Sequence, residues 1–188
     1  MLYHVSQTAG LRTLTPHVST HGKPWVYATE NMVTALLFGA KVDDFDFFIS
    51  TDEAANPEIF ECYPDALQTV YSGKRCSVYE VSEEGFLRNM TSWDVELVCE
   101  NEVAVQNEIA VSNLYETLLE QESRGNLKIH RYELSEEYRK RIARHIVDRL
   151  IRFGIDFDHC TEHDARFATH YKKIIEALRS VTDGHLLA

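Results

Sequence analysis

Short apolar segments that suit β-strands dominate the first 130 residues. Ser77–Val81 is typical, because it is rich in β-branched and aromatic residues. The stretch 7–22 is instead rich in Thr, Gly, His and Ser, which predicts a loop or a short turn. The pattern predicts strands at 1–5, 25–28, 45–49, 59–62, 77–81, 95–98, 103–111 and 127–130.

Three short helices are predicted in the same part of the chain. Thr29 is expected to cap a helix that Gly39 closes. A second helix is expected over 65–71. Asn113 is expected to cap a third, which ends near residue 122. This part therefore combines many short strands with few helices.

The hydrophobic period changes after Ser135. Apolar residues then recur at helical spacing at Ile142, Ile146, Leu150 and Phe153. We expect this helix to end at Gly154 and a second helix to run over 161–181, so that the two form a hairpin. The sequence predicts an α+β protein with a split antiparallel β body at 1–132 and a C-terminal helical hairpin at 133–188.

Composition indicates one soluble globular domain. The 188 residues are 44% hydrophobic and 26% charged, and no apolar run approaches the roughly 20 residues of a membrane span. The first residues lack the basic and apolar regions of a secretory signal. The cysteines at 62, 76, 99 and 160 show no CxxC spacing, which suits reduced thiols in a cytoplasmic protein.

Charge is unevenly distributed along the chain. Residues 1–123 carry a net charge of −14, and residues 124–188 carry +3. The acidic body argues against nucleic acid as a partner, because phosphates are bound by clustered Lys and Arg. Nine Lys and Arg between Arg124 and Arg152 leave two interpretations open: a solvated helix face that pairs with the acidic body, or a basic surface for nucleic acid or another partner.

Three separated motifs occur in a distinctive order. They are Leu2–Ser6 (LYHVS), Gly22–Thr29 (GKPWVYAT) and Gln106–Tyr115 (QNEIAVSNLY). In order and spacing they resemble the three motifs of ADP-ribosyltransferases of the poly(ADP-ribose) polymerase type, over roughly the first 130 residues. The resemblance implies that fold and a catalytic triad of His4, Tyr27 and Glu108.

The resemblance also implies roles in binding NAD. Glu108 would stabilise the positive charge that develops on the ribose when nicotinamide leaves, through the 2′-hydroxyl. Tyr27 and Phe38 would enclose the nicotinamide ring, and His4 would bind the adenosine ribose. Val5 would contribute backbone groups to the nicotinamide amide, followed by Ser6, which the family also has. NAD is thus the expected substrate, without a metal.

Three positions bear on which reaction is expected. Gln106, two residues before Glu108, resembles the acceptor-recognition residue of toxin-like transferases, and on a strand the two would share a face. This favours transfer to a protein side chain or a small-molecule acceptor, whose identity is unknown. The sequence shows no extended loop of the kind that chain elongation requires in this family, so we expect transfer of one ADP-ribose. Ala35 stands where the polymerase-type enzymes have a Ser that bonds the nicotinamide amide. Together with Val5 in place of Gly, this favours the alternative of an inactive module that binds a nucleotide or a protein.

Two further alternatives stay open. Asp156, Asp158, His159, Cys160, His163 and Asp164 form either an acidic loop before a helix cap or the ligands of a metal-dependent hydrolase. The RNA 2′-phosphotransferases, which share the transferase fold and use NAD, are a related possibility. The acidic body argues against RNA as the substrate.

Overall fold

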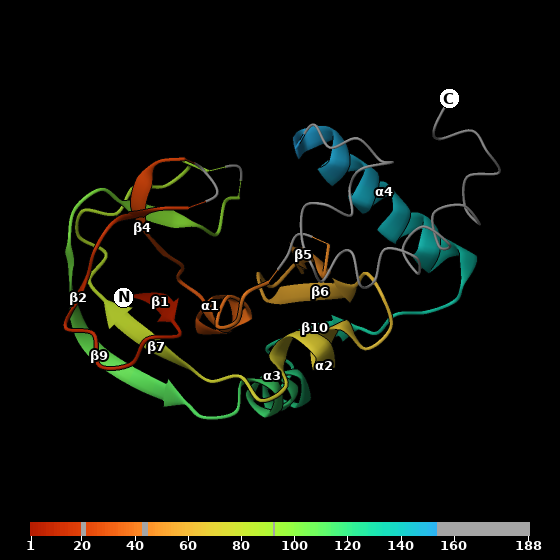
Figure 1. Ribbon diagram of the computed structural model, residues 1–188, viewed down its shortest axis with the longest axis horizontal. Coiled ribbons are helices and arrows are strands. Elements are labelled where there is room, and N and C mark those ends of the chain that lie inside the picture. The colour runs from red at the N-terminus through yellow and green to blue at the C-terminus, as the bar shows by residue number, and fades with distance from the viewer. Residues whose placement is uncertain (20–21, 43–44, 92, 154–188) are drawn as a thin grey trace. The chain divides into compact units, whose positions relative to one another are not determined.

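The protein has a mixed α+β structure with mostly antiparallel, curled sheets, as the sequence predicts (Figure 1). A computed structural model describes residues 1–19, 22–42, 45–91 and 93–153. Within these residues four helices are present, and none is long and apolar enough to cross a membrane.

The chain forms two compact units. The first comprises Met1–Lys41 and Tyr71–Leu127, and the second combines Val42–Val70 with the chain from Lys128 onward, described as far as Phe153. By their contacts, residues 42–70 belong with the C-terminal segment, whereas the division predicted from the sequence places them in the body at 1–132. The expected second helix of the hairpin, 161–181, lies outside the described residues.

A four-stranded antiparallel sheet organises the first unit. Its strands lie in the order β1 (Leu2–Ser6), β7 (Cys76–Val81), β9 (Val103–Val111) and β2 (Thr13–Leu14). β2 and its neighbour β3 (His17–Val18) fall in the stretch that we predicted to be a loop. Strands of two residues are too short to show an alternating pattern, and pairing with longer strands defines them.

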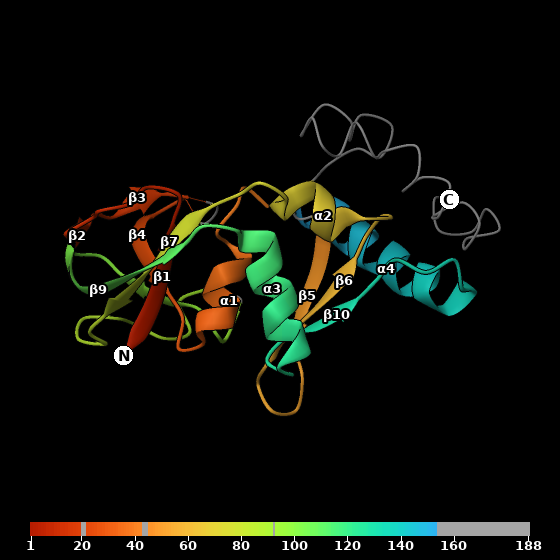
Figure 2. The ribbon, with the colours of Figure 1, turned by 90° about the horizontal axis from the view of Figure 1, so that it is seen from below.

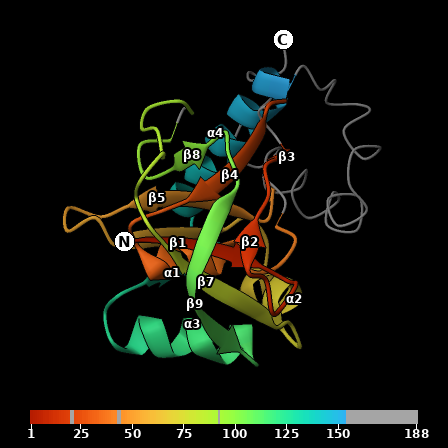
Figure 3. The ribbon, with the colours of Figure 1, turned by 90° about the vertical axis from the view of Figure 1, so that its left-hand side faces the viewer.

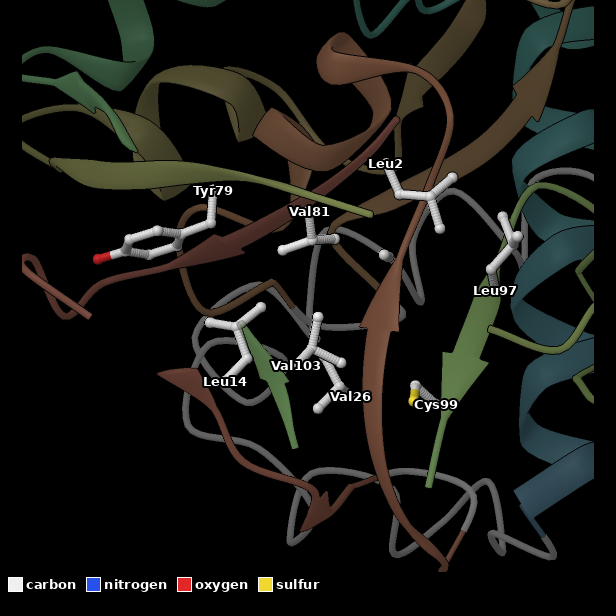
Figure 4. Packing of buried hydrophobic residues seen from close by; sticks show 9 residues of the cluster. Leu2, Leu14, Val26, Tyr79, Val81, Leu97, Cys99 and Val103 are labelled. Carbon is white, nitrogen blue, oxygen red and sulfur yellow. The ribbon is translucent and has the colours of Figure 1, made fainter. Parts of the chain in front are cut away.

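A second antiparallel sheet of three strands completes this unit. β4 (Pro24–Ala28) lies between β3 and β8 (Leu97–Cys99) (Figure 3). Side chains from the two sheets meet in one hydrophobic cluster (Figure 4). The cluster consists of Leu2, Leu14, Val26, Ala28, Tyr79, Val81, Leu97, Cys99 and Val103. This core fixes β1, β4 and β9, the three strands that carry the predicted triad.

Two helices of the first unit lie side by side (Figure 2): α1 (Met32–Leu37) and α3 (Leu114–Ser123). Asn113 caps α3, as predicted, by accepting a hydrogen bond from the Glu116 amide. The prediction for α1 was wrong by two residues, because Asn31 rather than Thr29 accepts the amides of the first turn. Thr29 is instead paired with Tyr3 of β1 through two backbone hydrogen bonds.

The second unit has a mixed sheet. β6 (Pro57–Glu61) pairs antiparallel with β5 (Phe47–Thr51) and parallel with β10 (Lys128–His130). The helices are α2 (Ala66–Tyr71), whose last residue belongs to the first unit, and α4 (Glu136–Phe153). Ser135 precedes α4, and its hydroxyl oxygen accepts the Tyr138 amide at 3.3 Å.

Glu58 binds three neighbours in this sheet. Its Oε1 lies 2.8 Å from the Lys128 ammonium and 2.6 Å from His130 Nε2, and the Ser50 hydroxyl donates to Oε2 at 3.3 Å. The Lys128 hydrogen bond is the largest of the contacts that lower the pKa of Glu58, from 4.5 to about 2. The ionised carboxylate is therefore part of the folded state down to acidic pH.

Glu58→Gln should lower the free energy of unfolding at pH 7 by about 1 kcal/mol, since it removes the charge from these hydrogen bonds. Because the pKa of Glu58 is lower in the folded state than in the unfolded chain, the ionised carboxylate stabilises the fold above pH 4.5. This contribution disappears as pH falls from 4.5 to about 2. Urea unfolding of both proteins at pH 7, 4.5 and 2.5 measures the difference. A difference that stays constant over this range would contradict the prediction.

Candidate active site

His4 and Glu108 lie on one face of the four-stranded sheet, on the two strands that flank β7. His4 pairs with Tyr79, and Tyr79 pairs with Glu108, so the three residues form one cross-strand row. Residues directly opposite each other project from the same face. At a strand spacing of about 4.8 Å, the backbones of His4 and Glu108 are roughly 10 Å apart.

His4 links this row to Tyr27, the remaining residue of the predicted triad. Its Nδ1–H donates a hydrogen bond of 2.7 Å to the Tyr27 carbonyl oxygen. Because a carbonyl only accepts, this bond fixes the proton on Nδ1 and leaves Nε2 as an acceptor. Burial lowers the pKa of His4 from its usual 6.5, with a smaller contribution from the charge of His17. The imidazole is therefore neutral at pH 7.

Glu108 is half-buried and held by several groups of the same unit. The Ser77 hydroxyl donates to Oε1 at 2.6 Å, and the Gly10 amide lies 3.1 Å from both carboxylate oxygens. The Tyr79 hydroxyl is 3.3 Å from Oε1 but only 2.7 Å from the Thr8 carbonyl. Hydrogen bonds from Ser77 and then Gly10 lower the pKa of Glu108 below its usual value, so the carboxylate is ionised at neutral pH.

Tyr27 is half-buried on β4, opposite Val98. Its ring meets the Trp25 ring edge-on, with centroids 6.1 Å apart. Burial, followed by the negative charge of Glu96, raises the pKa of its hydroxyl above 10. The hydroxyl is therefore neutral, and the ring remains partly accessible for stacking.

The backbone of Val5, the residue after His4, lies at an open edge of β1. Both backbone hydrogen bonds of Tyr3 are made with Thr29, on the side of β1 that faces away from β7. Because alternate residues of a strand direct their N–H and C=O to the same side, those of Val5 project from this edge too. The described residues include no strand that pairs with β1 at Val5 on that side.

Ser6 and Phe38, two further predicted site residues, have contacts of their own. The Ser6 hydroxyl accepts the Thr8 amide at 3.1 Å, within the turn that carries Gly10. Phe38 is 44% exposed and meets the Trp93 ring edge-on, at 5.7 Å between centroids. No contact of Phe38 with Tyr27, its expected partner around nicotinamide, is present among the described contacts.

Gln106 occupies a bulge in β9. Val81 pairs with Val105 and Glu80 with Asn107, so Gln106 is the extra residue between them. Tyr79 and Val81 share a face of β7, and their partners Glu108 and Val105 therefore share a face at a spacing of three. The expectation that Gln106 and Glu108 share a face assumes regular alternation along β9, and the bulge interrupts that alternation at Gln106. Asn107 is on the other face, where its amide donates to Glu80.

Motif matching missed the groups that bind Glu108: Ser77, Tyr79 and Gly10. The strand pattern predicts β7 correctly, but only its register with β9 brings Ser77 and Tyr79 beside Glu108. The other predicted cluster, at 156–164, lies outside the described residues. Among the described residues, no group of three or more His, Cys, Asp and Glu is arranged to hold a metal ion.

Comparisons of the chain with models of protein families, with curated proteins and with solved structures found no match. The residues of the site are therefore the basis for assigning a function.

Proposed function

We propose that this protein transfers a single ADP-ribose from NAD to a protein or small-molecule acceptor. The proposal includes an ADP-ribosyltransferase-type split β body with a C-terminal helical hairpin. One observation supports it above the others: His4 of the first motif hydrogen-bonds the Tyr27 carbonyl of the second motif and lies in one cross-strand row with Glu108 of the third. The backbone N–H and C=O of Val5, at the open edge of β1, suit the amide of nicotinamide, which offers a carbonyl acceptor and two N–H donors.

Each residue of the site then has a definite task. The ionised Glu108 accepts the 2′-hydroxyl of the nicotinamide ribose and stabilises the positive charge that forms as the bond to nicotinamide breaks. The Tyr27 ring stacks on the nicotinamide. The neutral His4 accepts a ribose hydroxyl at Nε2, because its Nδ1–H is already engaged by Tyr27. A nucleophilic atom of the acceptor then forms a bond to the ribose carbon from which nicotinamide has departed, and it loses its proton.

The acidic first unit constrains how the two phosphates of NAD are bound. Arg88 is engaged by Glu30 and Glu83. Arg12 lies close enough to Glu108 to contribute to its lowered pKa, and the Lys23 ammonium lies 5.2 Å over the Trp25 ring. Of the cations of this unit we assign Arg12 and Lys23 to the phosphates, since Arg12 is near Glu108 and Lys23 directly precedes β4, which carries Tyr27.

The direct test is incubation of the purified chain with NAD, followed by chromatography for free nicotinamide. The proposed reaction releases nicotinamide and leaves ADP-ribose on an acceptor or, in the absence of one, on water. Mass spectrometry of the chain and of added acceptors detects the transferred group. If NAD stays intact at high protein concentration, with or without cell extract as a source of acceptors, the proposal is wrong.

Tyr27→Ala should weaken NAD binding about tenfold, because an aromatic stack contributes roughly 0.5–1.5 kcal/mol and 1.4 kcal/mol corresponds to a factor of ten. Tyr27→Phe keeps the ring and should bind like wild type. Calorimetric titration of each variant with NAD gives the affinities. Equal affinities of the Ala and Phe variants would exclude stacking on Tyr27.

A second function is favoured by the contacts of Glu108. Its carboxylate is already bound by Ser77 and Gly10, so it also serves to fasten the turn after β1. With Val5 and Ala35 at the two departures from the family pattern, the chain would then be a transferase-like module that binds a nucleotide or a protein without catalysis. Saturable NAD binding without nicotinamide release would identify this function.

A further inference from the structure

Among the described residues, Ser77 makes the shortest hydrogen bond to Glu108. It is 2% exposed, and its hydroxyl donates to Oε1 at 2.6 Å. The hydroxyl comes from β7, the strand next to Glu108, which the hydrophobic cluster holds in place. A buried donor on a paired strand keeps its position when the exposed turn around Gly10 moves.

The two oxygens of the Glu108 carboxylate are not equivalent. Oε1 is close to Ser77, Tyr79 and Gly10. Oε2 has the exposed Gly10 amide as its hydrogen-bond donor among the described residues. The Tyr79 ring belongs to the hydrophobic cluster, and Figure 4 shows its hydroxyl directed away from the aliphatic side chains. The carboxylate is thus anchored through Oε1, and Oε2 is the oxygen that a ligand can engage.

We infer that Ser77 is a positioning residue, which holds Glu108 through Oε1 so that Oε2 is presented to a ribose hydroxyl. This inference rests on the proposed function and adds a residue that none of the three motifs contains. Gly10 is the exchangeable partner. Its φ of +76° places it in a turn at the surface, and a substrate hydroxyl that donates to Oε2 replaces its amide there.

The test compares Ser77→Ala with Ser77→Thr, which retains the hydroxyl. In Ser77→Ala the turnover number for nicotinamide release should fall about 10- to 100-fold, because the reacting carboxylate is no longer held in one orientation. The KM for NAD should change little. The pKa of Glu108, followed by NMR of the labelled carboxyl carbon, should rise toward its usual value, since Ser77 is the main cause of the shift.

Ser77→Thr should recover the wild-type pKa and most of the rate, which a loss of packing alone would not explain. Ser112→Ala is the matched control, because it removes an exposed serine hydroxyl directly after β9 and should leave both quantities unchanged. If Ser77→Ala does not fold, as judged by circular dichroism, Ser77→Cys keeps the volume with a weaker donor and should change both quantities in the same direction.

The outcomes separate this inference from the function on which it rests. Active wild-type protein with an unchanged rate and an unchanged Glu108 pKa in Ser77→Ala overturns the role of Ser77 and leaves the transferase proposal intact. Wild-type protein that releases no nicotinamide overturns the proposed function, and with it any catalytic role of Ser77.

Discussion

Replacing Glu108 by Gln should slow nicotinamide release about 100- to 1,000-fold while NAD still binds with nearly wild-type affinity. Gln has the same shape and retains a carbonyl oxygen that can accept the Ser77 hydroxyl, so the local structure is preserved. It lacks the negative charge that stabilises the positive ribose as nicotinamide departs. The loss therefore falls on the transition state rather than on the bound substrate.

The measurement combines single-turnover nicotinamide release with calorimetric NAD binding. Glu80→Gln is the matched control, because Glu80 belongs to the same sheet but lies on its other face, where it accepts the Asn107 amide. It should keep the wild-type rate. Equal rates of nicotinamide release for Glu108→Gln and wild type would exclude Glu108 as the catalytic carboxylate.

Local patterns predict most elements of the first unit, because the information that defines them is local. β7 is a run of β-branched and aromatic residues, and the Asn113 cap lies next to the helix that it starts. The start of α1 was placed at Thr29 because Thr29 and Asn31 are both good capping residues. Pairing of Thr29 with Tyr3 settles the choice, and no local pattern contains that contact.

The residues of the candidate site also differ in whether the local sequence identifies them. His4, Tyr27 and Glu108 can be found from the sequence because each lies in a motif. Ser77 is an ordinary serine in a strand, and it becomes a partner of Glu108 only through strand register. The bulge at Gln106 is equally hidden from motif matching, because the register of β9 with β7 defines it.

Buried acids of the second unit are equally hidden in the sequence. Glu61 is 2% exposed, and its carboxylate accepts the Leu67 amide at 2.8 Å and the Tyr132 amide at 2.9 Å. Asp46 is also buried, and the Tyr63 hydroxyl donates to it. In the composition both acids count only toward the net charge, which does not distinguish buried from exposed carboxylates. Only the positions of distant backbone amides and hydroxyls show that they are internal.

Phe60→Ala should lower the free energy of unfolding of the second unit by about 3–5 kcal/mol. The ring is 2% exposed and stacks on His130, with centroids 3.9 Å apart and planes at 6°. The Arg141 guanidinium carbon lies 3.9 Å from the ring centroid, and the Phe48 ring is 5.4 Å away. One aromatic ring thus joins β5, β6, β10 and α4.

Removing the ring leaves a cavity among three strands and a helix. It also removes the cation–π contact between this ring and the Arg141 guanidinium. Urea unfolding followed by far-UV circular dichroism measures the change. Phe60→Leu fills most of the volume and should cost less than Phe60→Ala. Phe38→Ala, at a ring that is 44% exposed, should cost less than about 1 kcal/mol. A loss at Phe60 no larger than that at Phe38 would mean that this aromatic stack does not hold α4 on the sheet.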